Sequence, residues 1–174
     1  FTMWKQKIII NNYLNSCQFD SDDSLLDIPC GAGYIGEILA KYSCSIVASD
    51  ISIEMMDLAA NEYPNKNFNG FLQSDITNTP FQANEFKCVV VLALMHRLPI
   101  DIRAQVLSEV FRVTNKYVII SYSIESLLQK VKWKILSVIS NKHINLFIKF
   151  LLNKFHVFFN LRYIVLCIHY RLTD

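Results

Sequence analysis

Three of the chain's four glycines (Gly31, Gly33 and Gly36) follow an apolar run that ends in Asp27. Glycine costs backbone entropy and adds no packing, so the cluster indicates a backbone that turns tightly or lets another group come close. The G-x-G-x-x-G spacing at a strand-to-helix junction favours an anionic group, and Asp50, about 20 residues on, is placed to bind ribose hydroxyls. The pattern predicts a nucleoside-type ligand; a tight packing turn without a ligand is the alternative.

The elements that would position these residues alternate along the chain. Strands are expected at Leu25–Ile28, Ser45–Ser49, Phe68–Leu72, Phe86–Leu92 and Tyr117–Tyr122. Helices are expected at Tyr34–Tyr42, Ile53–Tyr63 and Ile100–Val113, after a leading helix in "MWKQKIIINNYL". Continuously apolar runs such as "CVVVLAL" are typical of a parallel sheet covered on both faces. The alternation predicts βαβ units, and hence a doubly wound α/β sheet.

The final third of the chain is less regular. Apolar residues recur at helical spacing over 124–138, and a second helical stretch is expected at Ile144–Asn153. The runs "HVFFN" and "RYIVLCIHY" would close the sheet as a hairpin, with a loose helical cap as the alternative. We therefore predict one α/β domain over residues 1–174: a leading helix in 1–22, a ligand-binding core in 23–122, and helices and closing strands in 123–174. Its sheet is expected to be mainly parallel and seven-stranded, with the last strands antiparallel to the rest.

Composition narrows the class of protein. The net charge of +2 is too small to argue for nucleic acid as a partner. The five cysteines are widely spaced with no C-x-x-C pair, which indicates reduced thiols in the cytoplasm and neither a disulfide framework nor a metal site. There is no signal peptide, and no uninterrupted apolar stretch reaches the ~20 residues that a membrane-spanning helix needs. These features predict a soluble, cytoplasmic protein.

The position of Asp27 separates two nucleotide-binding patterns. A dinucleotide fingerprint has glycine directly after the strand, whereas here an acid stands inside the strand end, which disfavours a nicotinamide-dependent reductase. The segment "LLDIPCGAG" resembles the first motif of the class I S-adenosylmethionine-dependent methyltransferases. "VASDISIEMMDLA", "LQSDITNTPF", "FKCVVVLALMHRLP" and "RAQVLSEVFRVTNKYVII" resemble the segments that follow in that family, in order, over about Leu25 to Tyr122. The likeness is to the broad group that acts on small molecules, quinones and lipids.

The resemblance implies S-adenosylmethionine as cofactor and a set of residues that bind it. Asp27 and the backbone at Gly31 and Gly33 would hold the methionine part, and Asp50 would hold the ribose hydroxyls. The adenine would lie against Ile51, Asp75 and Ile76, with backbone contributed by Leu92. For each acid an ordinary cap or turn role is the alternative, although an acid at an apolar strand end such as Asp27 needs a buried partner.

Two departures from the family pattern concern turns. Pro29 stands where the family usually has the first glycine of its loop, so the loop must use a geometry that suits a fixed φ. The fifth strand is approached through "VTNKY" without the Pro-Gly-Gly turn common in relatives. A non-catalytic, methyltransferase-like partner subunit is the alternative that Pro29 supports.

The acceptor side offers one titratable candidate, His96, just past the fourth strand. Its pKa class suits a general base for a hydroxyl acceptor, and a packing role is the alternative. The ending "LALMH" lacks the Asn/Asp-Pro-Pro-aromatic motif of enzymes that methylate nucleobase amino groups, and no Asp, Asn or His cluster predicts a metal. The sequence predicts methyl transfer to a small-molecule or lipid-like acceptor.

One further expectation concerns membranes. Trp133 would lie on an outer helix face with Lys130 and Lys134, a composition typical of helices that rest at a membrane interface. Packing of Trp133 under an upstream segment or against another subunit is the alternative. The first interpretation predicts peripheral membrane contact, where a lipid-like acceptor would be collected.

Overall fold

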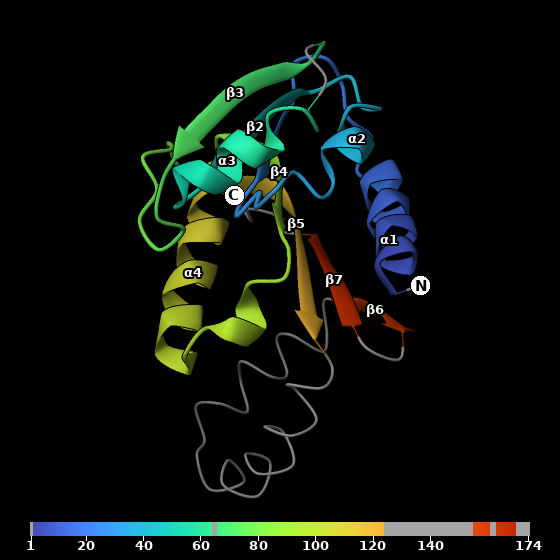
Figure 1. The fold of residues 1–174 in the computed structure, drawn as a ribbon. Helices are drawn as coiled ribbons and strands as arrows, with labels where there is room; N and C mark the ends of the chain where they lie inside the picture. The colour runs from blue at the N-terminus through green and yellow to red at the C-terminus, as the bar shows by residue number, and fades with distance from the viewer. Residues whose placement is uncertain (1, 64–65, 124–154, 161–162, 170–174) are drawn as a thin grey trace, which may run out of the picture.

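The first strand of the chain lies inside the sheet, between the second and the fourth strands. The computed structural model describes residues 2–63, 66–123, 155–160 and 163–169, and these residues form a seven-stranded sheet in the order β3-β2-β1-β4-β5-β7-β6 (Figure 1). The strands are β1 (Ser24–Asp27), β2 (Ser45–Asp50), β3 (Phe68–Gln73), β4 (Phe86–Val91), β5 (Thr114–Ser123), β6 (Phe155–Asn160) and β7 (Tyr163–His169). The chain order therefore reverses beside β1, which is where ligands bind in doubly wound sheets.

Strand directions confirm the mainly parallel sheet and correct one detail. Strands β1 to β5 pair in parallel, and β7 is antiparallel to both β5 and β6. The predicted closing hairpin is thus confirmed. The expectation that the last strands all oppose the rest is wrong for β6, because β6 opposes β7 and so runs in the direction of β5. The two helices predicted in 124–153 lie outside the described residues.

Helices cover both faces of the sheet. They are α1 (Thr2–Ser16), α2 (Gly36–Leu39), α3 (Ile53–Ala59), the 3-10 turn η1 (Met95–Arg97) and α4 (Ile100–Val113). Figure 1 shows α1 and α4 on opposite sides of the sheet. In β4, Cys88 and Val90 join the apolar cluster under α1, α2 and α3, whereas Val89 and Val91 join the cluster under α4. All of β4 is buried and, apart from Lys87, its residues are apolar, as is typical of a strand covered on both faces.

The passage from α4 to β5 needs no linker. The helix ends at Val113 as predicted, but the strand begins at Thr114, three residues before the predicted start at Tyr117. The Thr114 hydroxyl donates a hydrogen bond to the Val110 carbonyl at 2.6 Å, which satisfies one of the carbonyls that a helix end leaves without a partner. The helix thus passes into the strand at Val113 and Thr114 without a glycine or proline turn.

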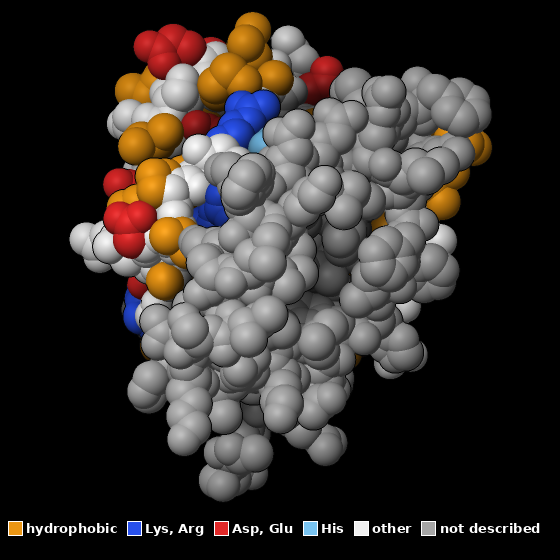
Figure 2. All heavy atoms as spheres, turned by 90° about the horizontal axis from the view of Figure 1, so that it is seen from below, with side chains coloured by type: hydrophobic (Ala, Val, Ile, Leu, Met, Phe, Trp, Pro, Cys, Tyr) orange, Lys and Arg blue, Asp and Glu red, His pale blue; other side chains and the backbone are white. Residues whose placement is uncertain are grey.

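The described part of the face drawn in Figure 2 carries charges of both signs. In Figure 2, which views the molecule from below, apolar, basic and acidic side chains alternate along the described edge without separation by sign. Among the described residues, no helix combines the length and apolar character needed to cross a membrane.

A buried carboxylate ties the loop after β3 to α4. Glu109 accepts hydrogen bonds from the Thr79 backbone N–H at 2.8 Å and from the Thr79 hydroxyl at 2.6 Å. Arg112 donates to both oxygens of the same carboxylate, at 2.6 and 2.7 Å. The Arg112 guanidinium and the Thr79 donors lower the pKa of Glu109 to about 2.

Replacement of Glu109 by Gln is expected to lower the free energy of unfolding at pH 7 by about 1.5–3 kcal/mol, the scale of hydrogen bonds to a charged group. Because the folded pKa is depressed, this stabilisation is present above about pH 4.5 and is lost as the pH falls toward 2. Urea unfolding at pH 7 and pH 3 measures both effects. Glu37→Gln, at an exposed position of α2, is the control; an equal loss in both variants would contradict the assignment.

Candidate functional site

The candidate site lies where β1 and β2 end side by side. In the parallel register, Asp27 at the end of β1 pairs with Ala48 of β2 and Val90 of β4. Beyond the strands, the Cys30 N–H donates to the Ser49 carbonyl at 2.8 Å, so the glycine loop stays attached to β2. The loop begins with a cis Ile28–Pro29 peptide bond. Because Cys30 is bonded to β2, Pro29 does not detach the loop from the sheet.

Asp50 connects the glycine loop to the start of α3. Its Oδ2 atom accepts the Gly31 N–H at 2.8 Å, and its Oδ1 atom accepts the Ser52 N–H at 3.0 Å. The side chain is buried, with 6% exposure. A carboxylate offers about four lone-pair sites, so each oxygen keeps capacity for one more donor such as a ribose hydroxyl.

The three clustered glycines have different surroundings. A Cβ on Gly33 would lie 2.6 Å from the Cβ of Glu62, and a Cβ on Gly36 would lie 2.5 Å from the Glu62 carbonyl oxygen. Gly31 has only an ordinary contact, 3.8 Å from Met55, but its φ of +52° is one that glycine adopts without strain. The packing-turn alternative thus describes Gly33 and Gly36, and Gly31 is the glycine whose backbone has room for a ligand.

Asp27 is a buried acid with the buried partner that its position requires. Its side chain is 1% exposed, and its Oδ2 atom accepts a hydrogen bond from the Tyr63 hydroxyl at 2.5 Å. Burial, with a smaller contribution from the charge of Asp50, raises the pKa of Asp27 to about 7, although the Tyr63 hydrogen bond opposes the shift. Burial and the Asp27 charge also raise the pKa of Tyr63, so Tyr63 is the donor. The sequence carries no local signal for Tyr63, because 36 residues separate it from Asp27.

The predicted adenine side combines an exposed apolar residue with a turn. Ile51 follows Asp50 directly and is 64% exposed. Asp75 is exposed, and its Oδ1 atom accepts both the N–H and the hydroxyl of Thr77 at 2.8 Å, which is the turn role left open as its alternative. Ile76 is half-buried and packs against the cluster under α4.

The end of β4 forms the third side. Leu92 is buried at 9% exposure, and Ala93 adopts a φ of +53° with its N–H bonded to the Ser121 hydroxyl at 2.8 Å. His96 lies half-buried on η1, next to the fully buried Met95. Ser121 had no signal in the sequence, since it lies within an apolar run of β5.

The site fits an adenosine-type cofactor that carries a positive charge. Asp50 accepts the Gly31 N–H, and its charge is near enough to raise the pKa of Asp27, so two acids lie at the glycine loop. Ile51 offers an exposed apolar surface beside Asp50. Within the described part of the chain, no three side chains of metal-binding type come together.

Alanine at the glycines should separate backbone strain from packing. Gly31→Ala is expected to lower the free energy of unfolding by about 1–2 kcal/mol, the cost of a left-handed conformation for a residue with a Cβ. Gly33 also has a positive φ, of +78°, so Gly33→Ala should carry a similar strain cost and, in addition, an overpacking cost of about 1–3 kcal/mol against Glu62. Urea unfolding measures both; a larger loss at Gly31 than at Gly33 would contradict the assignment of packing to Gly33.

Comparison with known proteins identifies the family. A family model described as a methyltransferase domain matches residues 25–117, more than half of the chain. A comparison of the sequence with curated proteins finds no significant match.

Solved structures share the fold at low sequence identity. Magnesium protoporphyrin IX methyltransferase from Synechocystis PCC 6803, solved with bound S-adenosylhomocysteine, has a TM-score of 0.69 and 17% identity, covering 97% of this chain and 83% of that chain. A protein of Methanococcus maripaludis, proposed to be an S-adenosylmethionine-dependent methyltransferase, has a TM-score of 0.68 and 20% identity, with 97% and 86% covered. An S-adenosylmethionine-dependent methyltransferase of Methanosarcina mazei has a TM-score of 0.64 and 20% identity, with 95% and 98% covered. The chain belongs to the methyltransferase family, in the class I S-adenosylmethionine-dependent group that its sequence resembles.

Proposed function

We propose that this S-adenosylmethionine-dependent methyltransferase acts on a small-molecule acceptor of apolar or amphiphilic character. The main support for the donor site is the Asp50 carboxylate at the carboxyl ends of β1 and β2. It accepts the Gly31 and Ser52 N–H groups and still has lone pairs for further donors. For the acceptor, support comes from "LALMH" after β4, which lacks the motif of nucleobase amino methylation. One structure of similar fold is named for magnesium protoporphyrin IX, a small molecule.

The donor would lie across the ends of β1, β2 and β4. Asp50 would accept the ribose hydroxyls, and it is already fixed for this by two backbone amides. The Gly31 backbone and the carboxyl of Asp27 would hold the methionine part, with Gly33 supporting the turn from behind. Ile51 would pack beside the adenine, with Asp75 and Ile76 along its edge and Leu92 on the side of β4.

S-adenosylmethionine supplies an already activated methyl group, so the protein contributes binding and orientation. Correct placement of an acceptor can contribute roughly 7–11 kcal/mol to lowering the barrier. Ala93, held by Ser121, and His96 on η1 would form the acceptor side. For a hydroxyl acceptor, His96 would be the base that takes the proton as the methyl group arrives.

Replacement of Asp50 by Ala is expected to weaken S-adenosylmethionine binding by about 1–3 kcal/mol, because hydrogen bonds to a charged group are lost. Calorimetry on the wild type, Asp50→Ala and the control Asp57→Asn, an exposed acid of α3, measures the effect. The wild type should bind S-adenosylmethionine and not NADH. An unchanged affinity in Asp50→Ala would show that the ribose site is misassigned.

Transfer of label from methyl-labelled S-adenosylmethionine tests the acceptor class. A panel would include a quinol, a fatty acid in vesicles, a protoporphyrin and an adenine-containing oligonucleotide. We expect label in the organic extract of one of the first three, and a loss of about 10²-fold in kcat for His96→Gln if that acceptor is a hydroxyl. Label on the oligonucleotide alone would overturn the proposal, and donor binding without any transfer would favour a partner subunit.

To methylate a lipid-like acceptor, the protein would have to contact the membrane that holds it. Lys130, Trp133 and Lys134 lie outside the described residues, so peripheral membrane contact rests on the sequence alone. Sedimentation with anionic liposomes at low salt, against a Lys130/Lys132/Lys134→Glu variant, tests it. The small-molecule proposal does not depend on the result.

A further inference from the structure

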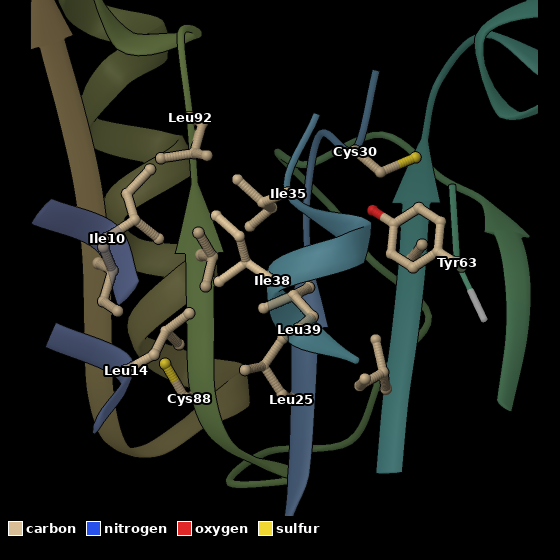
Figure 3. Packing of buried hydrophobic residues seen from close by; sticks show 14 of the residues in the cluster. Ile10, Leu14, Leu25, Cys30, Ile35, Ile38, Leu39, Tyr63, Cys88 and Leu92 are labelled. Carbon is tan, nitrogen blue, oxygen red and sulfur yellow. The ribbon is translucent and has the colours of Figure 1, made fainter. Parts of the chain in front are cut away.

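Tyr63 and Asp27 form a buried pair behind the glycine loop. The Tyr63 hydroxyl donates to the Asp27 Oδ2 atom at 2.5 Å, and the two residues are 3% and 1% exposed. Figure 3 shows the hydroxyl of Tyr63 beside Cys30, the residue that precedes Gly31. The pair therefore lies one residue away from the turn at which the donor is expected to bind.

Packing fixes the Tyr63 ring in this position. The ring stacks on Phe68 with centroids 4.8 Å apart, and it meets Phe71 edge-on at 5.4 Å. A Cβ on Gly36 would lie 3.2 Å from the Tyr63 ring, so α2 closes the remaining side. Held on these sides, the hydroxyl stays directed at Asp27.

Among the described residues, no cationic side chain acts on the Asp27 carboxyl; the groups around it are acidic, neutral or apolar. Asp50 lies on the β2 side, and its negative charge raises the pKa of Asp27. Cys30 lies in the loop, and burial with the two nearby carboxylates raises the pKa of its thiol to about 12, so it stays neutral. Glu62, exposed beside Gly33, is a further acid, and the part of β4 paired with β1 is apolar.

We propose that Tyr63 is a positioning residue: its hydroxyl holds the Asp27 carboxyl in place at the donor site. When the cationic donor binds, Asp27 releases its proton to solvent. The inference rests on the proposed function. The step moves one proton from the carboxyl to bulk water and forms no covalent bond. The resulting carboxylate is stabilised by the Tyr63 hydroxyl and by the positive charge of the donor.

Charge distinguishes the donor from its product. S-adenosylmethionine carries a sulfonium, whereas S-adenosylhomocysteine is an uncharged thioether at the same atom. A nearby positive charge favours the ionised form of a carboxyl, so Asp27 should lose its proton with the donor and retain more of it with the product. The affinity for the donor should consequently rise with pH through neutrality more steeply than the affinity for the product.

Calorimetry in phosphate and in Tris at pH 7 measures the released proton, because the two buffers differ in ionisation enthalpy. We expect the apparent binding enthalpy of S-adenosylmethionine to differ between the buffers, with a smaller difference for S-adenosylhomocysteine. In Asp27→Asn the difference should disappear. Equal enthalpies in the two buffers for the wild type would overturn the inference.

Tyr63→Phe tests the role of the hydroxyl. Loss of a hydrogen bond that lowers the pKa of Asp27 should move the release of the proton to higher pH. Tyr42→Phe is the matched control, because the Tyr42 hydroxyl bonds to Asn11 and Asn15 of α1 and not to Asp27. The same pH dependence in Tyr63→Phe and wild type would overturn the positioning role, and if Tyr63→Phe does not fold, the Asp27→Asn and wild-type measurements decide. A failure of the wild type to bind either ligand would instead remove the proposed function.

Discussion

The carboxylate of Asp50 is the contact on which the candidate site depends. It joins three segments, since it ends β2, accepts the Gly31 N–H of the glycine loop and accepts the Ser52 N–H before α3. Ser52 in turn caps α3 by accepting the Met55 N–H at 3.2 Å. Asp50, which is expected to bind the ribose hydroxyls, therefore also fixes the conformation of the glycine loop beside it. Binding and loop geometry cannot vary independently at this position.

Below the site, two apolar layers hold the strand ends in register. The apolar residues of β1 and β4 alternate between the cluster under α1, α2 and α3 and the cluster under α4, so both faces of these strands are packed. Asp27 is the exception among the residues of β1 that are buried. A buried acid without a cationic partner costs stability, and such exceptions are found where function requires them.

The sequence predicted the central elements because their signals are local. The bounds of α4 agree with the prediction, since its apolar residues recur at helical spacing between Pro99 and Thr114. Helix α2, predicted over Tyr34–Tyr42, spans only Gly36–Leu39, and α3, predicted over Ile53–Tyr63, ends at Ala59. Turns occupy the neighbouring positions, where Gly33 and Gly36 lie against Glu62. The direction of β6 and the pairing of Tyr63 with Asp27 could not be predicted from the sequence, because both depend on contacts between distant segments. Of the candidate site, the sequence located Asp27, Gly31, Asp50 and Ile51 together, and it missed Tyr63, Glu62 and Ser121.

Helix α4 and strand β5 follow each other directly in the chain, without a loop between them. No residue between Val113 and Thr114 can absorb a rotation, and the Thr114 hydroxyl binds the last turn of the helix. At the far end of β5, Ser121 holds the backbone of Ala93 at the side where an acceptor would arrive. One continuous segment, from Ile100 to Ser123, therefore supplies both the helix that covers this face of the sheet and the hydroxyl that holds Ala93.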